Sequence, residues 1–172
     1  MKPDRVKNDR VKNDRAKTAA VLTISDSSFQ RKRKDTSGPA VVRKLKAAGF
    51  QVVSTAIIPD ERKQIEAALV QACKSARLVV TVGGTGVAPR DVTPEATTAV
   101  VERLVPGIPE KMRSDGAKKT PFAALSRGIC GTRGTSLILN LPGSPIAATE
   151  SLKAVIKMLP HALDLLEGHT DH

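Results

Sequence analysis

The chain has 172 residues, a formal net charge of +11 and only three aromatic side chains, all of them phenylalanine. Its length favours one compact domain, and a hydrophobic content of 40% supplies enough apolar surface for a core, which argues against wholesale disorder. No apolar run approaches the roughly 18 residues that cross a bilayer, and no stretch fits a signal-peptide core. We therefore expect a soluble, cytoplasmic protein with no membrane partner. Cys73 and Cys130 lack metal-type spacing, so neither a zinc site nor a disulfide framework is indicated.

The N-terminal segment is a short repeat. The unit Asp-Arg-Val-Lys-Asn begins at Asp4 and Asp9, and a degenerate third copy runs from Asp14 to Lys17. The period matches neither a helix face nor a strand, and few of its side chains are apolar. We therefore predict a basic, low-complexity, disordered tail over residues 1–18 and one domain over residues 19–172. The tail contributes +4 to the net charge and the run Arg31–Lys34 another +4, which leaves +3 for the rest.

Buried strands and amphipathic helices alternate through the first half of the domain. The expected strands cover Ala20–Ile24, Gln51–Ile58 and Arg77–Val82. A polar loop from Ser25 to Gly38 follows the first strand. The first helix begins at Ser37-Gly38-Pro39 and ends near Gly49, and the second follows Asp60.

The second half continues the alternation. Thr93 is the expected N-cap of a helix that runs towards Leu104, and Pro109–Ser114 is a further helical piece. A fourth strand covers Ser136–Leu141. The helix that starts at Pro145 is broken by Pro160 before a last piece that ends near Gly168. This order predicts an α/β fold with a mostly parallel sheet covered on both faces, in which ligands bind beyond the carboxyl ends of the strands.

Polar and glycine-rich segments stand at those strand ends. They are Ser25-Asp26-Ser27, Pro59-Asp60, Gly83 to Asp91 and Asn140 to Ser144. The glycine-rich turn is neither a dinucleotide fingerprint, because Pro89 stands where a small residue is needed, nor a P-loop, because no Gly-Lys-Ser/Thr follows. Glycines at a strand end still let a ligand approach the backbone amides. We favour a binding loop over a plain turn.

Asp60 and Asp91 follow two of the expected strands, and the fold can bring them together. Mg²⁺ is usually held by one or two carboxylates with substrate phosphates and water, which suits such a pair. A helix-capping role for Asp60 and a turn role for Asp91 remain open alternatives. Ser126-Arg127 supplies a hydroxyl and a guanidinium for phosphate or heterocycle recognition. No serine has a histidine partner in a hydrolytic motif.

Several collinear motifs resemble those of the MogA/MoaB family of molybdenum-cofactor biosynthesis proteins. The resemblance covers about Ala19 to Gly168, and the Leu-Ile-Leu-Asn-Leu-Pro-Gly segment is closer to the MogA branch, whose activity is molybdopterin adenylyltransferase. The motifs are Thr23-Ile-Ser-Asp26, Ser37-Gly-Pro39, Ile58-Pro-Asp60, Val82-Gly-Gly-Thr-Gly86, Arg90-Asp-Val-Thr-Pro-Glu95, Leu125-Ser-Arg127 and Leu139-Asn-Leu-Pro-Gly-Ser144.

The resemblance implies a three-layer α/β/α sandwich that forms a homotrimer or hexamer. It also implies a nucleotidyltransferase that moves AMP from Mg-ATP to the terminal phosphate of molybdopterin and releases pyrophosphate. Mg²⁺ is the implied cofactor, and Asp60 and Asp91 match the catalytic, metal-binding positions. The implied substrate-binding residues are Ser25, Asp26, Gly83, Gly84, Thr85, Gly86, Ser126, Arg127, Asn140, Pro142, Gly143 and Ser144.

Two other functions compete with this enzyme. One is a non-catalytic molybdopterin-binding scaffold of the MoaB type, against which the presence of Asp60 and Asp91 argues. The other is nucleic-acid binding through the basic tail, which the lack of interleaved aromatic residues disfavours. The N-terminal repeat and the Arg31–Lys34 run depart from the family pattern. Phe29 and Phe122 are the only candidates for stacking on a pterin ring.

Overall fold

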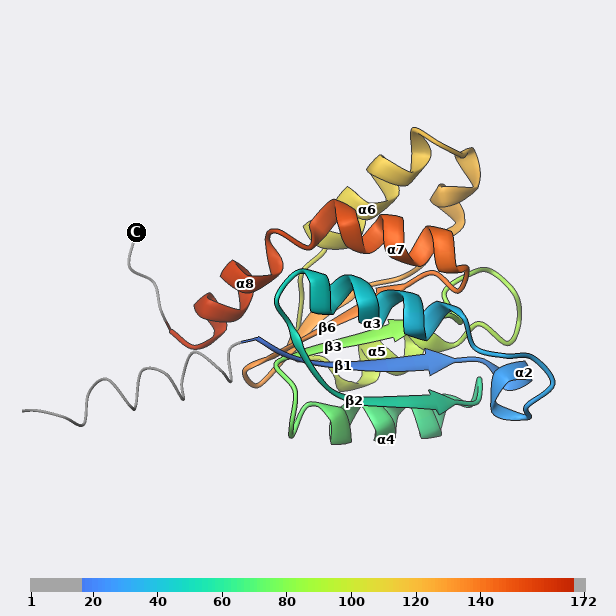
Figure 1. Ribbon diagram of the computed structural model, residues 1–172, viewed down its shortest axis with the longest axis horizontal. Helices are drawn as coiled ribbons and strands as arrows, with labels where there is room; N and C mark the ends of the chain where they lie inside the picture. The colour runs from blue at the N-terminus through green and yellow to red at the C-terminus, as the bar shows by residue number, and fades with distance from the viewer. Residues whose placement is uncertain (1–16, 169–172) are drawn as a thin grey trace, which may run out of the picture.

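The computed structural model describes residues 17–168 (Figure 1). The expected N-terminal tail therefore lies outside the described residues up to position 16. Strand β1 covers Thr18–Ile24, so the regular structure begins one residue before the expected domain boundary. Thr18 is buried and pairs with Gln51, which places it in the sheet rather than in the tail.

A six-stranded sheet forms the centre of the molecule, in the order β2-β1-β3-β6-β5-β4. Strands β2, β1, β3 and β6 are parallel, and β5 and β4 extend the sheet through antiparallel pairs. The predicted α/β class with a mostly parallel sheet is thus confirmed. The remaining strand bounds are Gln51–Ile58 for β2, Leu78–Val82 for β3, Arg103–Leu104 for β4, Cys130–Arg133 for β5 and Ser136–Leu141 for β6.

Helices cover both faces of the sheet, and α3 and α4 lie on opposite sides of it in Figure 1. One face packs against α3, α6, α7 and α8, and the other against α4 and α5. The bounds are Asp26–Phe29 for α2, Ser37–Ala47 for α3, Arg62–Ala72 for α4, Thr93–Val100 for α5, Gly107–Ala117 for α6, Pro121–Leu125 for the 3₁₀ helix η1, Pro145–Val155 for α7 and Leu159–Leu166 for α8.

Alternate residues of the central strands enter the two separate cores. In β1, Ala19 and Val21 face the α3 side, whereas Ala20 and Leu22 face the α4 side. Successive side chains of a strand point to opposite faces, so a strand covered on both sides is apolar at most positions on both faces. This explains why β1, β3 and β6 are fully buried, unlike the edge strand β2.

The expected helix from Thr93 to Leu104 is too long. Helix α5 ends at Val100, because the next residues leave the helical conformation and pair with β5. Glu102 and Val105 donate backbone hydrogen bonds to the Thr132 and Cys130 carbonyls at 2.7 and 2.8 Å. The expected polar loop after β1 also contains a short helix, α2. A break before the last helix is present, but it lies earlier than expected: α7 ends at Val155 and α8 begins at Leu159, so Pro160 lies in the first turn of α8 and not at the break.

Within residues 17–168, no helix is long and apolar enough to cross a membrane. Cys73 and Cys130 are both free thiols. Burial raises the pKa of Cys130 to about 12, so the thiol stays protonated at neutral pH.

Candidate active site

Three loops meet at the carboxyl edge of the sheet, after β1, β3 and β6. Gly83 has a φ of 109°, and a Cβ at this position would lie 2.3 Å from the Ile24 carbonyl oxygen. A Cβ on Gly143 would lie 3.4 Å from the Gly83 Cα. The Ser37 hydroxyl at the start of α3 donates to the Gly143 carbonyl at 2.6 Å. Glycine is required at position 83, because a side chain would both clash and strain the backbone.

Asp26 and Asp60 hold each other through reciprocal hydrogen bonds. The Asp26 amide donates to Asp60 Oδ2 at 2.8 Å, and the Asp60 amide donates to Asp26 Oδ1 at 3.0 Å. The helix-cap alternative for Asp60 is therefore wrong, because Glu61 occupies the N-cap position of α4 and makes no side-chain cap. The pair links the loops that follow the neighbouring strands β1 and β2.

Arg90 covers the Asp26 side of this pair. Its Nε and Nη2 atoms donate to Asp26 Oδ2 at 3.1 and 2.7 Å, and Nη2 also lies 2.8 Å from Glu61 Oε1. The hydrogen bond from Arg90 lowers the pKa of Asp26. Desolvation raises the pKa of Asp60, and the charges of Asp26 and Asp91 add to that rise.

Asp60 and Asp91 both lie against the glycine-rich turn. A Cβ on Gly84 would be 3.1 Å from Asp60 Oδ1, and one on Gly86 would be 2.7 Å from Asp91 Oδ2. Asp91 Oδ2 also accepts from the Ala88 amide at 3.0 Å, which closes the turn. The structure thus brings together the two carboxylates that the sequence pattern selected from separate strand ends.

These carboxylates fit a magnesium ion that is shared with a substrate. Asp60 is partly desolvated and faces like charge, and a bound cation relieves that repulsion. No group of three or more His, Cys, Asp or Glu side chains in residues 17–168 forms a metal cage. Mg²⁺ does not need one, since it keeps water and substrate phosphate oxygens among its ligands.

A cavity of about 830 Å³ opens on the other side of the glycine-rich turn, between α6, η1 and α7. Its volume lies within the usual range for small-molecule sites, about 300–1,000 Å³. Five of the predicted binding residues line it: Thr85, Gly86, Ser126, Pro142 and Gly143. Phe122 lines it as well and is 75% exposed, whereas Phe29 does not.

The cavity combines apolar walls with a basic rim. Met112, Ala123, Leu125 and Ile156 supply apolar surface. Six basic residues outnumber the two acidic ones, Asp115 and Glu150: they are Lys111, Arg113, Lys118, Lys119, Lys153 and Lys157. Sequence reasoning missed this rim, because its basic residues are spread over residues 111–119 and 153–157, which local sequence pattern does not bring together. A flat apolar ring system that carries a phosphate suits such a cavity.

Arg127 holds the glycine-rich turn and does not line the cavity. Its Nε donates to the Gly86 carbonyl at 2.7 Å and its Nη2 to the Asp91 carbonyl at 2.6 Å, while Nη1 pairs with Glu95 at the start of α5. Its guanidinium is thus engaged by groups of the protein, and its direct contact with substrate stays a prediction.

Asn140 is also a positioning residue. Its side chain is fully buried, donates to the Thr81 and Thr97 hydroxyls at 2.9 Å each, and accepts from the Ile129 amide at 3.2 Å. These contacts form a buried polar network that joins β3, β6 and α5, and the substrate contact expected of Asn140 stays a prediction.

Two predicted serines cap helices. Ser25 Oγ accepts from the Ser28 amide at 3.3 Å, and Ser144 Oγ accepts from the Ala147 amide at 3.1 Å. Thr93, the expected N-cap of α5, instead donates from its hydroxyl to the Gly83 carbonyl at 2.9 Å, because Val92 occupies the cap position. The threonine thus links the start of α5 to the glycine-rich turn.

Comparison with known proteins identifies the family to which the chain is similar. Residues 20–161 match the family model described as "Probable molybdopterin binding domain". The chain is 41% identical over 153 residues to a molybdopterin adenylyltransferase of Helicobacter pylori, and the alignment covers 87% of each chain. It is 45% identical over 154 residues to the molybdenum cofactor synthesis protein cinnamon of Drosophila melanogaster, with 87% of this chain covered but only 25% of that longer protein.

A solved structure shows the same fold. The molybdopterin biosynthesis enzyme MoaB of Thermus thermophilus aligns with a TM-score of 0.83 and 48% identity, over 88% of this chain and 96% of that one. The matched region contains the sheet, the glycine-rich turn and both aspartates. The chain therefore belongs to the molybdopterin-binding domain family of molybdenum-cofactor biosynthesis proteins.

Proposed function

We propose that the protein is a molybdopterin adenylyltransferase that uses Mg-ATP. The observation that carries the proposal is the position of the glycine-rich turn. Thr85 and Gly86 line the cavity, while the same turn contacts Asp60 and Asp91 on its other side. Molybdopterin would occupy the cavity, and Mg-ATP would lie against the carboxylates. The name of the bacterial relatives, molybdopterin adenylyltransferase, supports this assignment.

The reaction needs alignment more than acid–base chemistry. An ionised oxygen of the molybdopterin phosphate attacks the α-phosphorus of ATP, the bond between that phosphorus and the bridging oxygen breaks, and pyrophosphate leaves with the bonding electrons. Asp60 and Asp91 would hold Mg²⁺, which neutralises phosphate charge when bound. The Gly83–Gly86 backbone and the basic rim would orient the two substrates. No side chain has to remove a proton.

The competing function is a scaffold that binds molybdopterin without turnover. This alternative comes from the resemblance to the MoaB branch, which includes the Thermus thermophilus structure at 48% identity. The test is incubation of the purified protein with molybdopterin and Mg-ATP under reducing, anaerobic conditions, with chromatographic detection of adenylylated molybdopterin. The enzyme forms this product in many turnovers per subunit, whereas a scaffold binds molybdopterin and forms none.

We further propose that the protein acts in the cytoplasm as a homotrimer or hexamer. Exposed apolar side chains support self-association: Val87, Phe122, Leu125 and Ile146 are each more than half exposed, and strand β2 leaves one edge of the sheet unpaired. Such surface on a single subunit is typical of an interface. Residues 19–172 would form the domain that assembles.

A further inference from the structure

The basic run Arg31–Lys34 forms a loop that is anchored to the active-site edge at both ends. At its start, the Lys32 and Arg33 amides donate to the Ser27 carbonyl at 2.9 and 3.1 Å, which folds the loop back onto α2 beside Asp26. At its end, Asp35 accepts from the Thr23 hydroxyl at 2.7 Å and from the Ser37 amide at 3.0 Å. The loop therefore has a fixed position relative to the carboxylates.

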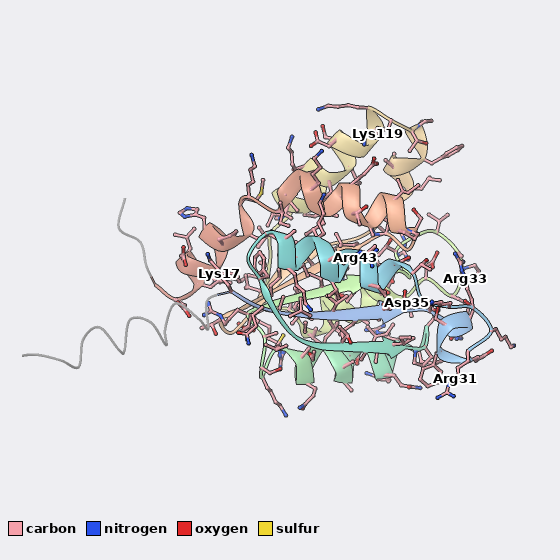
Figure 2. The ribbon with its side chains drawn as sticks, viewed as in Figure 1. Lys17, Arg31, Arg33, Asp35, Arg43 and Lys119 are labelled. Atoms are coloured by element: carbon pink, nitrogen blue, oxygen red, sulfur yellow. The ribbon has the colours of Figure 1, made fainter. Side chains whose placement is uncertain are left out.

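The four basic side chains of this loop are free to bind a ligand. All four residues are exposed, and within residues 17–168 none of their side chains makes a hydrogen bond or an ion pair. Most other basic side chains near this edge are engaged: Arg90 pairs with Asp26 and Glu61, and Arg127 pairs with Glu95. Figure 2 shows Arg31 and Arg33 at the same end of the molecule as Asp35, at the far end from Lys17.

The negative charge of the carboxylates at this edge means that a phosphate can bind there only if positive charge is also present. Five carboxylates lie on the loops that follow β1, β2 and β3: Asp26, Asp35, Asp60, Glu61 and Asp91. Within residues 17–168, Arg90 is the one basic side chain that forms an ion pair with them, so without the charge of Arg31–Lys34 a polyphosphate would be repelled. One Mg²⁺ offsets the charge of the phosphate next to the carboxylates, and a second source of positive charge is needed for the phosphates further out.

We propose that the Arg31–Lys34 loop is the polyphosphate subsite, which holds the β- and γ-phosphates of Mg-ATP and retains pyrophosphate until release. This inference rests on the proposed adenylyl transfer, and it adds the residues that would bind the β- and γ-phosphates. Lysine and arginine donors on a short loop suit terminal phosphate oxygens. The loop contributes nothing to AMP, whose single phosphate lies at the α-position between the carboxylates and the glycine-rich turn.

The test compares two variants that each lose four positive charges. In the loop variant Arg31, Lys32, Arg33 and Lys34 are replaced by Gln, and in the control variant Lys17, Arg43, Lys46 and Lys74, all exposed, are replaced by Gln. Binding of Mg-pyrophosphate, Mg-ATP and AMP is measured by isothermal titration calorimetry. We expect the loop variant to bind Mg-pyrophosphate and Mg-ATP about tenfold more weakly, a loss of about 1.4 kcal/mol, and AMP within about twofold of the unaltered protein.

The control variant should bind all three ligands within about twofold of the unaltered protein. Equal weakening in both variants would assign the effect to net charge and overturn the subsite, and so would unchanged pyrophosphate binding in the loop variant. The subsite would also be overturned if the unaltered protein bound no pyrophosphate but bound RNA, and if the loop variant lost that RNA binding. If the protein binds Mg-pyrophosphate through the loop yet forms no adenylylated molybdopterin, the proposed function fails while the subsite stands.

Discussion

Substitution of Asp91 can remove its negative charge and still keep the hydrogen bond that its side chain accepts. Among residues 17–168, the one hydrogen bond to its side chain comes from the Ala88 amide, which an asparagine oxygen accepts equally well. We expect Asp91→Asn to keep the thermal unfolding temperature and to lower turnover about 100-fold or more, in line with the loss of one electrostatic group at a transferring phosphate. Glu102→Gln, in a residue away from this turn, serves as the control. Unchanged turnover in Asp91→Asn would remove Asp91 from the catalytic site.

Arg90 gives Asp26 a pH dependence that can be measured directly. The Arg90 hydrogen bond lowers the pKa of Asp26 below its ordinary value of 3.8. A lowered carboxyl pKa adds stability above pH 3.8, and that stability is lost as the pH falls through the folded-state pKa. In Arg90→Gln we expect the Asp26 pKa to rise, and stability to drop at neutral pH but not below the folded-state pKa of the unaltered protein.

Carbon-13 NMR titration of the Asp26 carboxyl group, with unfolding measured in parallel, checks this prediction. Arg62→Gln is a matched control, because Arg62 pairs with Glu66 on the surface of α4 and has no contact with Asp26. An Asp26 pKa that stays the same in both variants would contradict the prediction.

At the scale of secondary-structure elements, Asn140 ties two strands and a helix together. Replacing it with Leu leaves the Ile129 amide and two threonine hydroxyls without their partner in a fully buried place. We expect Asn140→Leu to lower the free energy of unfolding by about 2–4 kcal/mol, since each unsatisfied buried group costs about 1–3 kcal/mol. Thr97→Val, which removes one of the three partners, should cost about 1 kcal/mol. Urea denaturation measures both, and a near-neutral Asn140→Leu would contradict the network.

The glycine-rich turn allows a second test at this scale. Gly83→Ala places a Cβ 2.3 Å from the Ile24 carbonyl oxygen at a φ of 109°, so the turn must shift away from β1. We expect a loss of stability of about 1–3 kcal/mol from the strained backbone and reduced molybdopterin binding, because the neighbouring Thr85 and Gly86 line the cavity. Gly134→Ala, with a φ of 53° but nothing within 4 Å of the added carbon, separates conformational strain from the clash.

The sequence pattern predicted the strands that stand between clear turn residues and missed those that do not. β2 and β6 lie at their expected bounds, because runs rich in Val, Ile and Leu between glycine and proline turn residues have few other solutions. Strand β5, Cys130–Arg133, has no such run, and β4 is two residues long. Both exist only because each is paired with the next strand of the sheet, a long-range contact that local pattern does not encode.

The contacts of the candidate site residues were predictable only in part, for a related reason. The juxtaposition of Asp60, Asp91 and the glycine-rich turn was expected because strand ends converge in parallel sheets. Residue type alone did not predict that the side chains of Arg127 and Asn140 also bind groups of the protein. Those contacts depend on Glu95, Thr81 and Thr97, which are remote in sequence and carry no signal of their own.

At the scale of the whole molecule, the net charge of +11 is unevenly placed. The Arg31–Lys34 loop and the basic rim of the cavity concentrate positive charge in two places where the proposed substrates would bring phosphate. Such an arrangement steers anions towards the site and weakens with salt. The chain as a whole is thus suited to two phosphate-bearing substrates.

Self-association is also a property of the whole molecule. With Phe122 75% and Ile146 72% exposed on one subunit, we expect light scattering to give three or six times the mass of the chain. A Phe122→Asp, Ile146→Asp double variant should shift this mass downwards if these side chains lie in the interface. A mass equal to one chain in the unaltered protein would contradict the expected trimer or hexamer.

The central claim is that the glycine-rich turn joins a molybdopterin cavity to carboxylates that hold Mg-ATP, so that AMP is transferred between them. The most direct measurement follows labelled phosphate in the complete reaction. With ATP labelled at the α-phosphate, the label should appear in molybdopterin, and with ATP labelled at the γ-phosphate it should appear in pyrophosphate in equal molar amount. Label from the γ-position in molybdopterin, or no transfer from the α-position while molybdopterin is bound, would contradict the account.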